Sequence, residues 1–463
     1  MVFSSVMFMY FFLPCVLLLY YVSPKKFKNL VILASGLFFY AWGEPVYVFL
    51  MLFTTFVDYM AGLFIHKYDK QPKKRTYALL GSLIINLGIL FVFKYSGFVA
   101  DIFGIDIETL PLPIGISFYT FQSISYTIDM YLRKIKVQKS FINYAAYVTL
   151  FPQIVAGPIV RYEDVQNEIN HRKINGVLIG EGVGIFIKGL FKKLFLANSI
   201  GMLWSEVKAM DYSEISVVTA WLGILAFTFQ IYYDFSGYSD MAVGLGKMLG
   251  FNFPENFRHP YISRSISEFW RRWHITLGSW FRSYVYIPLG GNRKGLAKTL
   301  RNLLIVWGLT GLWHGASWNF ILWGLYFGLI IIIEKLFLGR KLKRLRPWVG
   351  NAYTFILVVF GWVLFDTNTL GDAVSYLGAM FGAGSGFLDT VGAYEFKNYF
   401  VLFILCAVGS TEIFGRTVKK LQRYYGVSKI MCYATPIVQA AVLLMCTAYL
   451  VDSTYNPFLY FRF

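Results

Sequence analysis

The chain has 463 residues, of which 57% are hydrophobic, 19% aromatic and only 15% charged, with a formal net charge of +18. Soluble domains carry about 25% charged residues, so this composition excludes an ordinary soluble domain. The basic residues lie in short loops between apolar runs, as the positive-inside rule and attraction to anionic lipids predict. So apolar a chain is a poor candidate for binding nucleic acid.

Apolar runs long enough to cross a bilayer recur from end to end, which predicts an all-α, multi-pass membrane protein. Strand-like alternation is absent and argues against a β-barrel. Residues 3–21 lack a basic flank and a small-residue cleavage site, so we interpret them as a retained helix. We expect about 11 full spans plus two or three re-entrant or interfacial pieces. Basic loops at residues 25–28, 66–76 and 133–136 are assigned to the cytoplasm.

The middle of the chain is less regular. Residues 142–155 are short for a span and run into Pro152 and Pro158, which predicts a broken or re-entrant helix. Residues 176–204 carry three lysines, Lys188, Lys192 and Lys193, whose spacing suits a helix at the interface with snorkelling side chains.

A polar interruption follows the apolar run at residues 217–233. Asp234 and Asp240 flank Gly237 there, so we predict a second broken helix. Carboxylates at that depth are costly unless they have partners. We expect them to form structural ion pairs with the arginine-rich segment that follows.

Residues 256–301 hold nine Lys/Arg and a single acid, Glu268. A helix over residues 265–284 would carry tryptophans on one face and Arg271, His274 and Arg282 on another. Glu268 could pair with Arg271 or Arg272. The helix is too charged to span and is predicted at the cytoplasmic interface. The tryptophans, 270, 273 and 280, are expected to pack rather than to contact substrate.

The most unusual stretch is GLTGLWHGASWN at residues 308–319, which places His314 inside an apolar run from 303 to 333. A titratable ring at that depth is a functional-site hypothesis, although a histidine hydrogen-bonded to a neighbouring helix is the alternative. Glycines at 308, 311 and 315 would let another helix approach closely. On a continuous helix, Trp318 would share the His314 face.

The remaining chain predicts spans at residues 353–365, 399–413 and 433–450. We treat residues 1–463 as a single membrane domain. It comprises peripheral helices at 1–140, a catalytic core at 141–338 and C-terminal helices at 339–463.

The sequence gives little support for a metal site, a reactive thiol or a serine-hydrolase site. The five histidines form no H-x-x-x-H or H-E-x-x-H pair, so we expect no metal site and no permanently bound cofactor. The four cysteines show no C-x-x-C, and no Gly-x-Ser-x-Gly elbow is present. What remains is a neutral imidazole able to accept a proton or an acyl group, near basic loops that suit a phosphate-bearing donor.

A series of sequence blocks then gives the chain a family resemblance. In order they are LFPQIVAGPI (150–159), YDFSGYSDMA (233–242), FPENF (253–257) with PYI (260–262), FWRRWHITL (269–277), WFRSYVYIPLGGN (280–292), GLWHGA (311–316) and NPFLYFRF (456–463). The chain resembles the membrane-bound O-acyltransferase (MBOAT) superfamily, and within it the branch of alginate and peptidoglycan O-acetyltransferases. The block at 286–292 favours that branch over the related D-alanyl transferases of teichoic acids.

The resemblance implies a ring of tilted helices around a thin centre in a bacterial cytoplasmic (inner) membrane. It implies that His314 is catalytic and that His274 is the second recurrent histidine. It further implies that acetyl-CoA or another acetyl thioester is the cytoplasmic donor. An extracytoplasmic SGNH-type, esterase-like partner would then place the acetyl group on a polysaccharide.

We name further candidates for binding the donor or substrate, taken from the basic helix and the histidine stretch: Asn256, Arg271, Arg282, Trp313, Trp318 and Asn319. Three other functions stay open at this point: teichoic-acid D-alanyl transfer, acyl transfer between lipids, and a channel or transporter with a gating histidine.

Overall fold

The computed structural model describes residues 1–155, 157–452, 455–457 and 459. Ala156 and most of the NPFLYFRF block therefore lie outside the described residues. Every regular element in the described ranges is a helix, which confirms the all-α prediction. Seven of these helices are long and apolar enough to cross a membrane, so the chain is a multi-pass membrane protein. The expected 11 spans are not confirmed.

The chain divides into two compact units, and the first comprises Met1–Phe186 and Tyr238–Glu255. Its main helices are α1 (Leu13–Val22), α2 (Lys28–Ala41), α3 (Tyr47–Lys67), α4 (Pro72–Leu90), α5 (Ser96–Ile102), α6 (Ile116–Tyr131), α7 (Phe141–Val148), α8 (Phe151–Ile154) and α9 (Tyr162–Asn170). The predicted helix over residues 142–155 is broken, as expected, but the break between α7 and α8 lies at residues 149–150, ahead of the two prolines.

A buried polar cluster joins α3, α4 and α6. Asp58 of α3 is fully buried and accepts hydrogen bonds from Ser82 Oγ at 2.5 Å and Asn86 Nδ2 at 2.8 Å. Ser82 also lies 3.4 Å from the hydroxyl of Thr127 on α6. Polar groups within apolar helices are costly unless they find such partners, so this cluster ties the three helices in one register.

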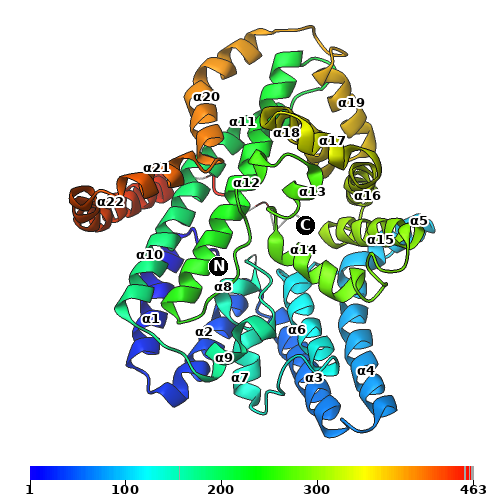
Figure 1. The fold of residues 1–463 in the computed structure, drawn as a ribbon, viewed down its shortest axis with the longest axis vertical. Coiled ribbons are helices and arrows are strands. Elements are labelled where there is room, and N and C mark those ends of the chain that lie inside the picture. Colours follow the sequence, from blue (N-terminus) through cyan, green and yellow to red (C-terminus); the bar gives the residue numbers. More distant parts are fainter. Residues whose placement is uncertain (156, 453–454, 458, 460–463) are drawn as a thin grey trace. The chain divides into compact units, whose positions relative to one another are not determined.

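The second unit comprises Ile187–Gly237 and Asn256–Phe463. Its helices are α11 (Ser199–Lys208), α13 (Ile266–Phe269), α14 (Ile275–Phe281), α15 (Leu296–His314), α16 (Trp318–Ile333), α17 (Gly339–Arg344), α18 (Pro347–Asp366), α19 (Leu370–Met380), α20 (Thr390–Gly409), α21 (Ile413–Leu421) and α22 (Tyr425–Asp452) (Figure 1). Helices α10 (Gly176–Phe191) and α12 (Val217–Met248) contribute residues to both units. Aromatic side chains of α16 and α18, such as Trp323, Phe327 and Trp362, form the centre of this unit's core.

Helix α12 runs unbroken from Val217 to Met248, so the predicted break at Asp234–Asp240 is wrong. The prediction that Asp234 forms an ion pair with the arginine-rich segment is also wrong. Its carboxylate pairs instead with Lys193, and both side chains are only 2% exposed. Asp234 Oδ2 further accepts the backbone N–H of Leu459 at 3.1 Å. Because these donors compensate the buried negative charge, helix α12 can continue through Asp234 without a break.

The same contact corrects the interpretation of Lys193. We predicted a lysine snorkelling toward water, but its ammonium is buried and also donates to the carbonyl of Pro457. Lys188 is exposed and Lys192 is half-buried, so only Lys193 of the three lysines departs from the expected position.

We expect Lys193→Met to destabilise the protein by about 3–5 kcal/mol, because it leaves the Asp234 carboxylate buried without its counter-ion. The double variant Lys193→Met/Asp234→Leu should recover much of that loss, since no buried charge remains. Thermal and denaturant unfolding in detergent micelles measures both.

Lys247→Met provides the control. Lys247 pairs with Glu181 at 2.5 Å, but those side chains are 25% and 51% exposed, so the expected loss is under about 1 kcal/mol. Equal losses at the two lysines would contradict the assignment of Lys193 as a buried structural charge.

Candidate active site

His314 is the last residue of α15, and the chain turns through Gly315 before α16 begins at Trp318. The apolar run is therefore two packed helices rather than one (Figure 1). A Cβ at Gly311 would collide with the carbonyl oxygen of Phe320, and a Cβ at Gly315 with the Phe320 ring. The expected close approach of another helix at these glycines is confirmed, and the partner helix is α16.

The His314 ring lies in a nearly closed aromatic cage. It meets Trp313, Trp323 and Phe365 edge to face, with ring centroids 5.0, 5.0 and 5.3 Å apart. The side chain is 6% exposed. Packing from α15, α16 and α18 thus fixes the ring in place, as a catalytic imidazole requires.

The basic segment before α15 is not one helix, which corrects the prediction for residues 265–284. α13 ends at Phe269, His274 has φ 45°, and α14 begins at Ile275. A left-handed residue cannot continue a right-handed helix, so the predicted common face of Arg271, His274 and Arg282 does not exist. The expected Glu268–Arg272 pair is confirmed at 2.8 Å.

Two side chains fix this broken segment. Glu334 on the chain after α16 accepts the backbone N–H groups of Ile266 and Ser267 at 2.6 and 2.9 Å, which caps the start of α13. Asn256 Oδ1 accepts from Thr276 N at 3.2 Å and from Thr276 Oγ1 at 2.8 Å at the start of α14.

His274 is held by the same Asn256. Its Nδ1 lies 3.2 Å from Asn256 Oδ1, an oxygen that cannot donate, so Nδ1 carries the proton and Nε2 is the acceptor. Burial lowers the pKa of His274, which lies outside the membrane-spanning helices, to about 3. The imidazole is therefore neutral near pH 7. Trp313 separates the two histidines, with ring centroids 6.0 Å from His274 and 5.0 Å from His314.

Two cavities meet at His314. The larger one, about 430 Å³, has an apolar wall that includes Trp270, Leu277 and Trp307, and both His274 and His314 line it. The smaller one, about 20 Å³, lies between His314, Trp323, Phe365 and Asp234. His314 and Trp273 line both cavities, so the imidazole is accessible from two sides.

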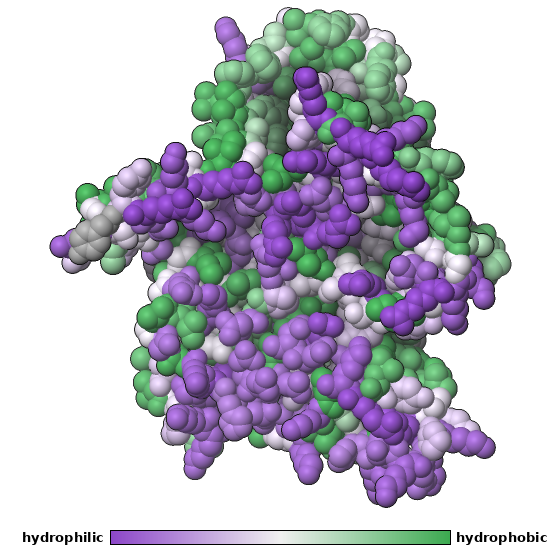
Figure 2. Space-filling model, in the orientation of Figure 1, coloured by the Kyte–Doolittle hydropathy of each residue, from purple (hydrophilic) through white to green (hydrophobic). Residues whose placement is uncertain are grey.

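A third, cationic pocket of about 770 Å³ adjoins the larger cavity, because Ser267, Arg271 and Leu303 line both. Its basic residues are Arg264, Arg271, Arg272, Lys335, Arg340, Lys343 and Arg416. Figure 2 shows hydrophilic residues gathered over α13, α17 and α21, which contribute to this pocket.

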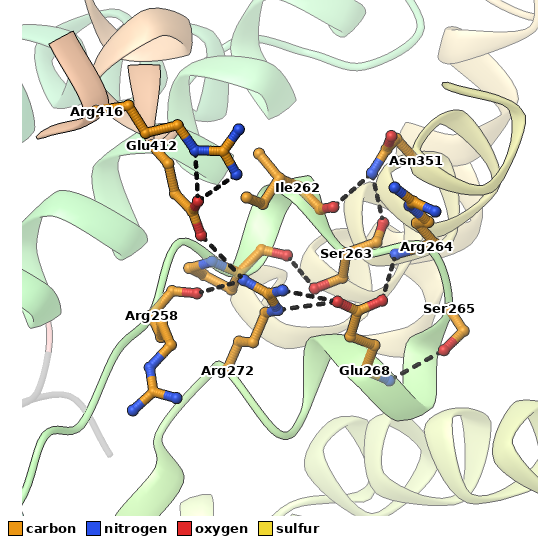
Figure 3. Close-up of polar contacts among 11 residues, drawn as sticks. Arg258, Ile262, Ser263, Arg264, Ser265, Glu268, Arg272, Asn351, Glu412 and Arg416 are labelled. Carbon is orange, nitrogen blue, oxygen red and sulfur yellow. Dashed lines mark hydrogen bonds and ion pairs between the residues drawn. The ribbon is translucent and has the colours of Figure 1, made fainter. Parts of the chain in front are cut away.

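The acids of the cationic pocket already have partners. Arg416 binds Glu412 at 2.7 Å, Glu412 lies 3.8 Å from Arg272, and Arg272 binds Glu268 at 2.8 Å (Figure 3). The hydrogen bond from Arg416 lowers the pKa of Glu412, so this acid is ionised at neutral pH. Among the described residues, Arg264, Arg271 and Lys335 have no carboxylate within ion-pair distance. The pocket therefore presents positive charge to an anionic ligand.

The structure brings some of the candidate residues together and leaves others out. Arg271, Arg282 and the two histidines line the larger cavity. Trp313 lies between the histidines, and Asn256 supports His274. Trp318 is 54% exposed and lines neither cavity, because α15 ends before it. Asn319 is buried and ties α16 to the carbonyl of Thr367 at 2.7 Å.

The sequence analysis did not identify several residues that line the smaller cavity beside His314: Trp323, Trp362, Phe365 and, in the described part of the C-terminal tail, Leu459. One signal was present. Gly324 and Gly328 are spaced four apart, and a Cβ on either would meet Trp307 of α15. That spacing marks the packing face of α16 and, with it, the position of Trp323.

The family model described as membrane-bound O-acyltransferase matches residues 131–365. The chain is 39% identical to the probable alginate O-acetylase AlgI of Pseudomonas putida over the full length of both proteins. It is 34% identical to the peptidoglycan O-acetyltransferase of Helicobacter pylori, over 82% of this chain and 80% of that protein. It is 29% identical to the teichoic acid D-alanyltransferase of Streptococcus thermophilus, over 56% and 66%.

We expect Gly311→Ala to destabilise the protein by about 1–3 kcal/mol, because the new methyl group would force α15 and α16 apart beside His314. Gly308→Ala is the matched control on the same helix, where the nearest atom would be 3.8 Å from the new Cβ. It should leave the melting temperature unchanged or raise it, since alanine favours a helix over glycine. Melting curves of both variants in detergent measure the difference. An equal change of melting temperature in the two variants would contradict the close crossing of α15 and α16.

Proposed function

Because the chain belongs to the membrane-bound O-acyltransferase family, it is a membrane acyltransferase, and we propose that it transfers acetyl groups to hydroxyls of an extracytoplasmic polysaccharide. The observation that carries this proposal is the buried imidazole of His314 at the junction of two cavities, one of which adjoins a cationic pocket. Both acetyltransferase relatives cover more than 80% of the chain, which favours an acetyl over a D-alanyl group. The acceptor would be an alginate-like exopolysaccharide or peptidoglycan.

The proposed donor is acetyl-CoA or another acetyl thioester that carries phosphate. Phosphate groups suit the cationic pocket, where Arg264, Arg271 and Lys335 supply charge that no carboxylate cancels. The apolar walls of the neighbouring cavity suit the uncharged arm of the donor, which ends in the thioester. Arg271 lines both spaces and would hold the donor where they join.

His314 would then act as a general base or as an acyl acceptor. As a base, its neutral nitrogen takes the proton of the acceptor hydroxyl while the oxygen attacks the thioester carbon. As an acyl acceptor, it would carry the acetyl group from one cavity to the other. Either route needs the ring held in a fixed position, and the aromatic cage supplies that.

His274 would contribute beside it. Its Nδ1–H is directed to Asn256, so its Nε2 is an acceptor, and its side chain lines the same cavity as His314. We assign it a role in catalysis or in positioning the donor. The neutral imidazole cannot bind phosphate as a cation would, so the arginines, not His274, are the proposed phosphate ligands.

A partner protein would complete the pathway. The sequence contains no Gly-x-Ser-x-Gly elbow, so the final transfer to polysaccharide fits a separate extracytoplasmic SGNH-type, esterase-like protein. The proposed location is the cytoplasmic membrane of a bacterium, with basic loops on the inner side.

His314→Gln should abolish acetylation of polysaccharide, by at least about 10²-fold, because the base or acyl acceptor is lost. The measurement is polymer-bound acetate in cells, with membrane insertion checked on the same samples. Labelled acetyl thioester and mass spectrometry of the purified protein would separate the two routes, since only one leaves an acetylated His314. Full activity in a correctly inserted variant would overturn the proposed function.

Arg271→Gln should raise the KM for the acetyl thioester about tenfold, the cost of one charge-assisted hydrogen bond. The kcat should change little if Arg271 acts on phosphate alone. Arg293→Gln is the control, because it removes the same charge from an exposed turn outside the described pockets. A KM equally raised in both variants would point to general surface charge instead of a donor site.

A further inference from the structure

Trp323 carries a buried hydrogen-bond donor with no acceptor. Its side chain is 1% exposed, and within the described part of the chain its indole Nε1 has no hydrogen-bond partner. A buried, unsatisfied N–H costs about 1–3 kcal/mol. The buried Trp204 in the same core donates to Asp366 at 2.6 Å, whereas the indoles of Trp270 and Trp362 share the lack of an acceptor within the described residues. Of these three unsatisfied indoles, Trp323 is distinguished by its direct ring contact with His314.

The residue that carries this donor lies at the proposed reaction centre. The Trp323 ring is 5.0 Å from the His314 ring at an interplanar angle of 82°, and both residues line the cavity of about 20 Å³. About 10–15 Å³ of such space holds one water molecule. The cavity therefore has room for an oxygen atom.

The carboxylate of Asp234 does not prevent negative charge from developing in this small cavity. Asp234 also lines the cavity, but its carboxylate pairs with Lys193 and accepts the N–H of Leu459. The remaining wall consists of apolar side chains, including Phe365 and Leu459. In such a setting one aligned N–H stabilises charge far better than it would in water.

We propose that the indole N–H of Trp323 donates a hydrogen bond to the carbonyl oxygen of the acetyl group during transfer. This rests on the proposed function, because it assigns the small cavity as the place of that oxygen. Trp323 would then be a catalytic residue that touches the reacting group, and its hydrogen bond to the bound carbonyl would strengthen as negative charge develops on the oxygen in the transition state.

In the proposed step, the acceptor hydroxyl attacks the thioester carbon directly. The hydroxyl oxygen forms the new C–O bond as His314 takes its proton, and the carbonyl π-electron pair moves onto oxygen. Trp323 stabilises that oxyanion. When the carbonyl re-forms, the C–S bond breaks, its electron pair leaves with sulfur, and the thiolate takes the proton from His314.

Trp323→Phe tests the assignment, because it keeps an aromatic ring and removes the N–H. We expect kcat to fall about 10²-fold with little change in KM for the thioester. The infrared band of a ¹³C-labelled thioester carbonyl bound to the protein should lie at lower wavenumber in wild type than in the variant. A merely structural role would not move this band.

Trp204→Phe is the matched control. It removes a buried indole from the same core, and Asp366 keeps its pairing with Lys208 at 2.8 Å. It should lower the melting temperature and leave kcat unchanged. Unchanged kcat and carbonyl frequency in Trp323→Phe would overturn the proposal while leaving the function of His314 intact. Full activity of His314→Gln would instead overturn the proposed function itself.

Discussion

The arrangement around His314 depends on the close crossing of α15 and α16. Gly311 and Gly315 allow the Phe320 backbone and ring to approach, and Gly324 allows the carbonyl of Trp307 to approach from the other helix. Contact at this range gains dispersion energy that larger side chains would forfeit. Because the helices are so close, His314 at the end of α15 lies in contact with Trp323 of α16.

Buried polar groups impose the second constraint. The chain satisfies several of them with partners distant in sequence: Lys193 with Asp234, Glu334 with the start of α13, and Asn256 with the start of α14. Each pairing fixes one segment against another, since leaving either partner alone would cost several kcal/mol. Among the described residues, the indole N–H groups of Trp270, Trp323 and Trp362 are exceptions, and that of Trp323 belongs to a ring in contact with His314, which lines both cavities.

The sequence predicted the all-α membrane class and the close approach at Gly311 and Gly315, because composition and residue spacing report such features directly. It failed where tertiary contact decides. Apolar residues continue past His314, so hydropathy alone cannot locate the helix end. The 3–4 spacing of residues 265–284 likewise suggested one helix, although His274 takes a left-handed conformation that periodicity does not detect. The partner of Lys193 lies 41 positions away (234 − 193) and was beyond any local pattern.

The three spaces near His314 differ in size and polarity in the same order as the parts of the proposed donor. The cationic pocket of about 770 Å³ suits phosphates, the cavity of about 430 Å³ has apolar walls for an uncharged arm, and the void of about 20 Å³ admits one oxygen. Arg271 joins the first two spaces and His314 the last two. A donor bound by its phosphates would therefore have only its terminal carbonyl at the imidazole. Binding energy gained at the cationic pocket would thus be spent on positioning the thioester, which is how remote contacts accelerate a reaction.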